Sequence, residues 1–211
     1  VDTLNGEEGT VSIVGAITPQ GADFSEPVTQ NTKRFVRAFW ALDKELAYAR
    51  HYAAINWNQS YSEYISDLGK WFNKNLGAEF LESRQRFITI LAEENKLMEI
   101  VKLIGKDVLP DDQKLVLEIA RVIRVGYLQQ NAFHKDDTFV PLEKQMLMMR
   151  LILYLERSAS TVIKEGKAFS LLVRSGVFDR VIKVKYDIPN DNLELFEDYY
   201  KWIDDTLSAI K

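Results

Sequence analysis

The chain has 211 residues, of which 46% are hydrophobic and 27% are charged, and its formal net charge at pH 7 is −4. This content of apolar side chains excludes wholesale disorder, and the mildly acidic balance gives no overall electrostatic attraction to nucleic acid. Because the chain has no cysteine and only two histidines, we expect no disulfide, no iron–sulfur cluster, no thiol nucleophile and no multi-histidine zinc site.

The first predicted element is a strand over Thr10–Ile17, a β-branched run that ends shortly before Pro19. A loop follows it. Ser25 is then placed to cap a short helix over residues 26–29, and Pro27 suits the first turn of a helix. The chain is therefore predicted to begin with a strand, a loop and a short helix.

The next stretch, Phe35–Leu42, is ambiguous, since its aromatic residues favour a strand while the spacing of its apolar residues also suits a helix. Asp43 is expected to cap a short helix that runs to about Arg50. Residues 51–58 are interpreted as strand and loop. We therefore expect residues 1–59 to form a small α/β segment with too few strands for a sheet of its own.

From Ser60 onwards the pattern is helical. Ser60 and Glu63 have the spacing of a capping box, which predicts a helix through Phe72. A long helix is predicted over Ala78–Ile104, because its apolar residues recur at helical spacing, and Gly105 ends it.

Proline and glycine residues mark the boundaries of the later helices. These helices are predicted from Asp111 to about Gln129, from Leu142 to about Lys164, in two short segments on either side of Gly176, and up to Ile210 behind a second capping box made by Asp191 and Glu194. The predicted fold class is mainly α, a C-terminal helical bundle that carries a small α/β segment at its N-terminus.

A search for catalytic and metal-binding motifs mostly fails. The chain contains neither the G-x-x-x-x-G-K-[ST] phosphate loop nor G-x-G-x-x-G. Residues 187–198 resemble a calcium loop only faintly, because Pro189 and Asn192 occupy a ligand position and the glycine position. We interpret Asp136–Asp137 and Asp204–Asp205 as solvated charge rather than as carboxylate dyads. Three methionines are interpreted as core residues: Met146, Met148 and Met149.

Residues 21–32, GADFSEPVTQNT, resemble the G-G-D-F-S-E-P-V-T-Q-N-T signature of the catalytic A subunit (alpha chain) of archaeal and vacuolar-type (A/V-type) rotary ATPases. The resemblance is strong from about Thr10 to Arg150 and weak beyond. It continues in the segments FWALD, AINW, QSYS, LQQNAFH and PLEKQ, at residues 39–43, 54–57, 59–62, 128–134 and 141–145. Ordered matches of this extent are far more specific than any short motif.

In the family that this chain resembles, the phosphate loop, the catalytic glutamate and the magnesium-binding aspartate precede the strand expected near Thr10. The resemblance implies that residues 1–59 are the end of the nucleotide-binding α/β domain and that residues 60–211 are the helical C-terminal domain. It also implies that ATP or ADP with Mg binds to the full-length protein. For this chain alone we expect no cofactor, no metal, no catalytic residue and no ATP hydrolysis.

The resemblance also implies which aromatic residues contact adenine. Residues 51–57, HYAAINW, are similar to the family's H-F-P-A-I-N-W, so Tyr52 is the first candidate. Tyr52 replaces the usual phenylalanine and keeps a stacking face, whereas Ala53 replaces proline and loosens the backbone. Phe133 matches the second aromatic of the adenine pocket, and Phe139 is a weaker third candidate. The alternative for Tyr52 and Phe133 is plain burial in the core.

Two other segments carry expectations from the same resemblance. One is the turn between the helices predicted over residues 78–104 and from residue 111, where the related F-type catalytic subunit carries an acidic loop that faces the rotor. This turn is therefore expected to face the rotor and consists of Asp107, Val108, Leu109, Pro110, Asp111 and Asp112. The alternative is an ordinary capped and solvated turn. Four residues are candidates for the interface with a neighbouring subunit: Ser25, Glu26, Pro27 and Gln30.

The whole enzyme that the resemblance implies couples ATP hydrolysis or synthesis to proton or sodium transport across a membrane. The expected partners are the B subunit and the central-stalk subunits, with no nucleic acid and no direct membrane insertion. The expected location is cytoplasmic, in the head of the complex and peripheral to the membrane. The alternative is a standalone helical protein-interaction module without nucleotide chemistry.

Overall fold

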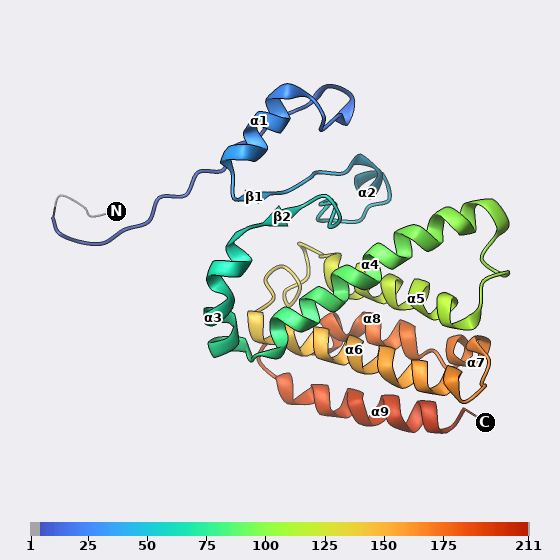
Figure 1. Cartoon of the computed structure of the whole chain (residues 1–211). Coiled ribbons are helices and arrows are strands. Elements are labelled where there is room, and N and C mark those ends of the chain that lie inside the picture. The colour runs from blue at the N-terminus through green and yellow to red at the C-terminus, as the bar shows by residue number, and fades with distance from the viewer. Residues whose placement is uncertain (1–4, 211) are drawn as a thin grey trace.

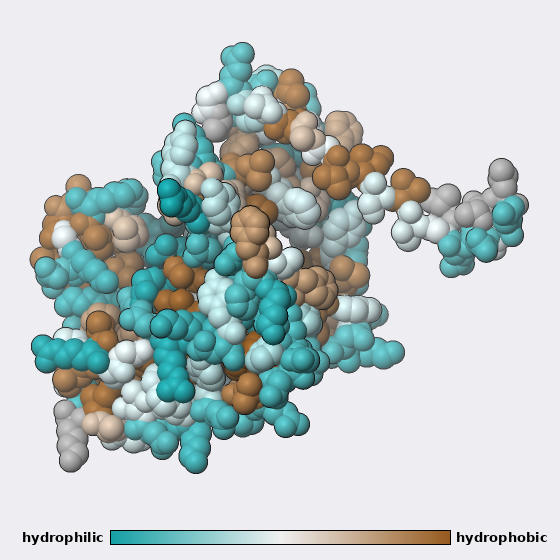
Figure 2. All heavy atoms as spheres, turned by 180° about the vertical axis from the view of Figure 1, so that it is seen from behind, coloured by the Kyte–Doolittle hydropathy of each residue, from teal (hydrophilic) through white to brown (hydrophobic). Residues whose placement is uncertain are grey.

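The N-terminal segment runs away from the body of the protein in the computed structural model, which describes residues 5–210 (Figure 1). The predicted strand over Thr10–Ile17 is wrong, because this stretch has no regular secondary structure. Val11, Ile13 and Val14 are 75%, 92% and 84% exposed, and Figure 2 shows apolar side chains along the extended segment. A strand needs a neighbour to satisfy its backbone groups, and none lies beside these residues in the described part of the chain.

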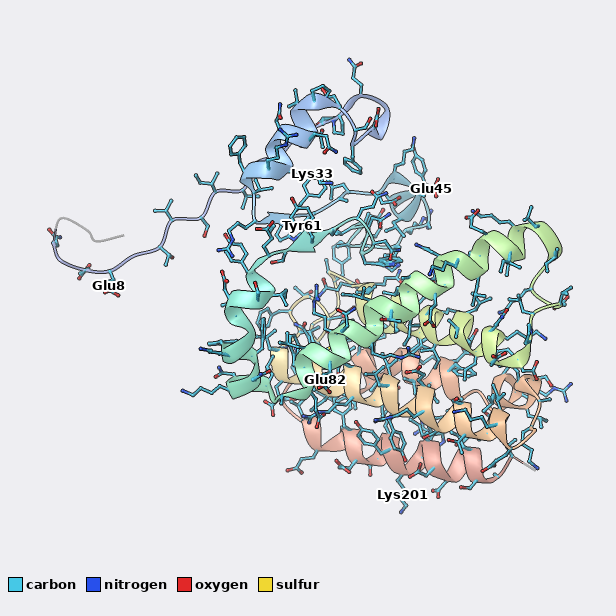
Figure 3. All side chains as sticks on the ribbon, viewed as in Figure 1. Glu8, Lys33, Glu45, Tyr61, Glu82 and Lys201 are labelled. Atoms are coloured by element: carbon cyan, nitrogen blue, oxygen red, sulfur yellow. The ribbon has the colours of Figure 1, made fainter. Side chains whose placement is uncertain are left out.

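Short elements make up residues 20–62: a 3₁₀ turn over Gln20–Ala22, helix α1 (Pro27–Phe35), strand β1 (Ala38–Phe39), helix α2 (Lys44–Tyr48) and strand β2 (Tyr61–Ser62). β1 pairs antiparallel with β2, so that Phe39 lies opposite Tyr61. Lys33 and Tyr61 join α1 to these strands (Figure 3). The Lys33 Nζ lies 4.8 Å from the centre of the Phe39 ring, and the Tyr61 hydroxyl donates to the Lys33 carbonyl at 3.0 Å.

Asp43 caps α2 as predicted, since its Oδ1 accepts from the backbone N–H groups of Glu45 and Leu46 at 2.8 and 3.2 Å. The cap predicted at Ser25 is wrong. The Ser25 N–H instead donates to the Asp23 side chain at 2.9 Å, and α1 begins at Pro27 without a side-chain cap and is longer than predicted.

Both predicted capping boxes are also wrong. The Ser60 hydroxyl donates to the Asn56 carbonyl at 2.6 Å and accepts from the Ala41 N–H at 3.0 Å. It therefore connects the backbone at Ala41 with the backbone at Asn56 instead of capping a helix. Helix α3 starts later, at Tyr64. Near the C-terminus, a 3₁₀ turn over Leu193–Leu195 stands before the last helix, which has no side-chain cap.

The remainder of the described chain is mainly helical, which confirms the mainly α fold class. Its helices are α3 (Tyr64–Leu76), α4 (Glu79–Ile104), α5 (Asp111–Val122), the π-helical segment η2 (Ile123–Leu128), α6 (Leu142–Lys164), α7 (Phe169–Arg174), α8 (Val177–Asp187) and α9 (Phe196–Ser208). Gly105 ends α4 as predicted, with a φ of 87° that favours glycine. No helix in the described residues is long and apolar enough to cross a membrane.

Helix α6 is central to the core and contacts α3, α4, α5, α8 and α9. Its buried face includes Leu151, Ile152 and Leu155. The three methionines Met146, Met148 and Met149 are buried in the same core, as predicted.

The π-helical segment η2 packs unusually close to α8. A Cβ atom placed on Gly126 would lie 3.1 Å from the Cα of Ile182, closer than side chains normally approach backbone. A larger residue here would therefore need the Ile182 backbone to move, so the tight packing and not an unusual φ accounts for the glycine. Single π turns inside α-helices occur often at functional sites, and η2 leads directly into the loop that carries Phe133.

Candidate functional site

The loop around Tyr52 lies against the end of η2. The Gln130 N–H donates to the Tyr52 carbonyl at 2.6 Å, and the Gln129 side-chain amide donates to the Arg50 carbonyl at 3.2 Å. Hydrogen bonds thus join two segments that are far apart in the sequence. The structure therefore places Tyr52 and the Phe133 loop at one junction between the N-terminal segment and the helices.

All three candidate aromatics are exposed: Tyr52 by 57%, Phe133 by 100% and Phe139 by 74%. Core burial, the alternative for Tyr52 and Phe133, is therefore wrong. Apolar rings of this size are normally covered, because burying one stabilises a protein by roughly 1.5–3 kcal/mol. Exposed rings on neighbouring loops offer flat apolar faces to a ligand or to another part of a larger protein.

The loop that carries Phe133 and Phe139, residues 129–140, is held by its own hydrogen bonds. Asn131 forms a turn in which its side-chain oxygen accepts from the Phe133 N–H at 3.0 Å. The Thr138 hydroxyl donates to the Ala132 carbonyl at 2.6 Å and closes the loop across Phe133. The Phe133 ring is thus carried by a closed turn.

Two carboxylates of this loop are buried, which corrects the interpretation of Asp136–Asp137 as solvated. Asp136 and Asp137 are only 8% and 2% exposed. The Asp137 carboxylate accepts from the Asn131 N–H at 2.7 Å and lies 3.7 Å from the Nζ of Lys185. Adjacent residues can both be buried here because they lie in a turn, whereas the prediction assumed that they lie on a helix.

Sequence reasoning missed Lys144 and Lys185, whose side chains are 0% and 2% exposed. The signal was present for Lys185, which follows the buried Val181 by four positions and therefore lies on the apolar face of α8. Burial is the main cause that lowers the pKa of both lysines, while Asp137 partly offsets it for each of them.

His51, next to Tyr52, is also buried and lies beside Trp57, with ring centres 5.5 Å apart. Burial lowers its pKa, and the positive charges of Arg124 and Lys185 lower it further. Its Nε2 makes no hydrogen bond within the described part of the protein. Its surroundings therefore favour the neutral form of His51, which adjoins Tyr52 in the same loop.

The predicted rotor-facing turn joins α4 to α5 at the other end of the bundle. Asp107 and Val108 are exposed, whereas Leu109 is buried. Asp111 does not point freely into solvent, because its carboxylate accepts from the Phe169 N–H at 2.9 Å and from Lys114 at 3.4 Å. The turn is therefore fixed to the start of α7.

The interface candidates lie at the start of α1, far from α9 in Figure 1. Ser25, Pro27 and Gln30 are exposed, and Glu26 is half-buried. The Gln30 side-chain amide donates to the Phe24 carbonyl at 2.7 Å, so one of its hydrogen-bond donors already has a partner near the start of α1. The structure does not bring these residues to the junction that holds Tyr52.

Two family descriptions match the chain. Residues 2–62 match the nucleotide-binding domain of the ATP synthase alpha/beta family, and residues 69–171 match the C-terminal domain of V and A type ATP synthase. A V-type ATP synthase alpha chain 2 from Clostridium tetani is 53% identical over 193 residues, which cover 92% of this chain and 33% of that protein. The chain belongs to the family of the A subunit (alpha chain) of A/V-type ATP synthases.

Archaeal members of this alpha-chain family are nearly as similar. The A subunit of the A-type ATP synthase of Methanopyrus kandleri is 46% identical over 203 residues, covering 96% of this chain and 34% of that protein. This chain thus spans about a third of the length of the curated relatives that it matches. It corresponds to the C-terminal region of the alpha chain.

A solved structure resembles the fold of this alpha-chain region. It is described as a unique ATP synthase subunit NeqB from Nanoarcheaum equitans, and the TM-score is 0.53 at 18% sequence identity. The match covers 66% of this chain and 32% of that chain. At this identity the likeness concerns the fold alone.

Proposed function

We propose that this chain is the C-terminal region of the catalytic subunit of a rotary ATPase or ATP synthase that couples ATP hydrolysis or synthesis to proton or sodium transport. Residues 1–59 are the end of the nucleotide-binding domain, and residues 60–211 are the helical C-terminal domain. The family matches over residues 2–62 and 69–171 support this division. In this proposal the region lies in the cytoplasmic head of the complex, peripheral to the membrane.

Tyr52, Phe133 and Phe139 form the adenine-facing side of the nucleotide site in this proposal. The observation that carries it is the hydrogen bond between Gln130 N–H and the Tyr52 carbonyl, which joins two loops whose aromatic rings are exposed. Stacking of a base on an aromatic ring contributes roughly 1–3 kcal/mol without hydrogen-bond readout. A bound adenine would cover rings that are otherwise left in water.

The residues of this chain fit adenine but not the phosphates or Mg²⁺. The carboxylates nearest to Phe133 in the sequence, Asp136 and Asp137, are buried and already hydrogen-bonded within the protein. No group of three or more His, Cys, Asp or Glu side chains that could hold a metal ion occurs among residues 5–210. When ATP and Mg²⁺ are bound, they supply the phosphoryl-transfer chemistry, and the residues of this chain bind and orient the base.

The second proposed role is that of a lever. The helical stretch from Asp111 to Leu128 connects the turn at residues 107–112 with the loop that carries Phe133. At 1.5 Å per residue this stretch is about 27 Å long. A small rotation at the adenine end therefore becomes a movement of several ångströms at the turn, which pushes a central-stalk subunit. Ser25, Glu26, Pro27 and Gln30 contact the B subunit in the same proposal.

The proposed adenine contact is tested in the assembled ATPase that contains the full-length alpha chain. Replacing Phe133→Ala should weaken ATP binding roughly 5- to 150-fold, because one stacking interaction is lost. Binding of inorganic tripolyphosphate, which has no base, should stay unchanged. Phe35→Ala is the matched control, since Phe35 is 87% exposed but lies on α1.

An equal loss of tripolyphosphate affinity, or unchanged ATP affinity, would contradict the proposed role of Phe133. Unchanged ATP affinity in Phe133→Ala, Tyr52→Ala and Phe139→Ala alike would favour the alternative function, a helical interaction module without nucleotide contacts.

A further inference from the structure

Two lysine side chains lie almost completely inside the helical domain, and neither the adenine contact nor the lever uses them. Lys144 of α6 is 0% exposed and Lys185 of α8 is 2% exposed. A buried ammonium group is costly unless hydrogen bonds or an opposite charge replace its water. The hydrogen-bond acceptors around each ammonium group therefore show which backbone segments the two lysines connect.

Lys185 holds the C-terminal end of η2. Its Nζ donates to the carbonyls of Val125, at 2.9 Å, and Gln129. These carbonyls lie where the helical stretch ends, and a cation there also complements the helix dipole. The Asp137 carboxylate lies 3.7 Å from the same ammonium group, so Lys185 connects η2 to the far side of the loop.

Lys144 holds the C-terminal end of α8 in the same way. Its Nζ donates to the carbonyls of Lys185 and Ile188 at 3.1 and 2.6 Å, and to the Asn190 side-chain oxygen at 2.9 Å. All three donors of this ammonium group are satisfied. Lys144 thereby fixes the backbone that carries Lys185 together with the side chain of Asn190.

Asn190 connects Lys144 with the 129–140 loop. Its side-chain amide donates to the Phe139 carbonyl at 2.9 Å, and its backbone N–H donates to Asp136 at 3.3 Å. The loop is thus held at Gln129, at Asp136–Asp137 and at Phe139, while the Phe133 ring between these points remains fully exposed. These several hydrogen bonds restrain the loop and oppose a movement that would fold Phe133 back onto the protein surface.

We propose that the buried Lys144, Lys185 and Asp137, together with the half-buried Asn190, form a polar clamp that positions the 129–140 loop, and with it Phe133 and Phe139, before nucleotide binds. This inference rests on the proposed adenine-facing role of the loop. The four are positioning residues, since they act on the base only through the loop. Preorganisation of this kind increases affinity by reducing the entropy lost on binding.

The first test measures the loop itself, without nucleotide. Asp137→Asn keeps the shape of the side chain and removes the charge that faces Lys185. In the 211-residue chain, hydrogen exchange at backbone amides of residues 130–138 should become about 10-fold faster, while exchange in α4 and α6 stays unchanged. Lys183→Met is the matched control for Lys185→Met, because Lys183 is an exposed lysine of the same helix.

Faster loop exchange in Lys185→Met but not in Lys183→Met supports the clamp. If Lys185→Met does not fold, Asp137→Asn alone decides the question. Unchanged exchange at residues 130–138 in a folded Asp137→Asn chain overturns the proposal.

The second test measures positioning in the assembled ATPase. Asp137→Asn should weaken ATP binding several-fold and leave tripolyphosphate binding unchanged, as Phe133→Ala does. If Phe133→Ala weakens ATP binding while Asp137→Asn loosens the loop without any effect on affinity, the positioning role is overturned. If exchange accelerates but Phe133→Ala has no effect, the clamp stands and the adenine assignment fails.

Discussion

His51 is a buried residue of the N-terminal part whose pKa depends on charges of the helical part. Its backbone N–H donates to the Leu46 carbonyl at 2.8 Å, and its ring lies against Trp57. Burial is the largest cause of its lowered pKa, followed by the charges of Arg124 and Lys185. Because Arg124 belongs to η2 and Lys185 to α8, the protonation of His51 is coupled to the helical domain.

The lowered pKa of His51 predicts a loss of stability in mild acid. Above its ordinary pKa of 6.5 the histidine is neutral in both the folded and the unfolded state. As the pH falls from 6.5 towards the lower folded pKa, only the unfolded state gains the proton, so the free energy of unfolding decreases. Between about pH 7.5 and 5.5, the free energy of unfolding of wild type should therefore fall more than that of His51→Gln, as measured by urea unfolding. Equal losses in both proteins would show that His51 is not the residue responsible.

Helix boundaries were predicted well from the sequence where a proline or a glycine sets them. The positions of Pro110, Gly105 and Pro141 fix the boundaries of the long helices, because they act on the backbone of their immediate neighbours. The strand over Thr10–Ile17 fails for the opposite reason, since its pairing depends on another strand. Ser60 fails as a cap because a distant partner, the Ala41 N–H, takes its hydroxyl.

The candidate site was predictable only in part for the same reason. The aromatics Tyr52 and Phe133 follow from a family resemblance, but periodicity cannot show that they are exposed. The burial of Asp137 depends on Lys185, which lies far away in the sequence. Charge pairs of this kind are visible only once the topology is known.

The contact between η2 and α8 predicts opposite effects for two glycine replacements. Gly126→Ala should destabilise the protein by about 1–3 kcal/mol, because its Cβ would press on the Ile182 backbone. Gly69→Ala in α3 is the control, since its Cβ would meet Leu81 at an ordinary 3.5 Å and alanine favours the helix. Thermal unfolding should show a lower Tm for Gly126→Ala and an equal or higher Tm for Gly69→Ala. A Tm for Gly126→Ala at or above that of wild type would mean that the contact is not tight.

Variants of the turn between α4 and α5 can show whether the proposed lever pushes the central stalk by steric contact or by charge. Asp107→Asn with Asp112→Asn should keep most of the torque in single-molecule rotation of the assembled enzyme, because a rigid helix transmits the push. Asp111 is left unchanged, since it holds the Phe169 N–H. Deleting Lys106–Val108 should uncouple hydrolysis from rotation while the buried Leu109 remains in place. Near-zero torque from the neutralised variant would show that charge carries the coupling.

At the scale of the whole molecule, the chain combines two parts that meet at one junction. The N-terminal part contributes Tyr52 and His51, and the helical part contributes η2, the 129–140 loop and the lysines beneath it. The same helical stretch continues to the turn at the opposite end of the bundle (Figure 1). An adenine bound at the junction would therefore contact both parts of the chain. Binding or release of the nucleotide would then change the contacts between these two parts.

The most direct test of the adenine assignment is photolabelling of the assembled enzyme with 2-azido-ADP, whose reactive group is on the base. We predict that label is incorporated at Tyr52 or within residues 132–139, that excess ATP prevents it, and that mass spectrometry of the digested protein finds none on α1 or α9. Nucleotide-protected label found only outside these two segments would contradict the assignment of the junction as the adenine site.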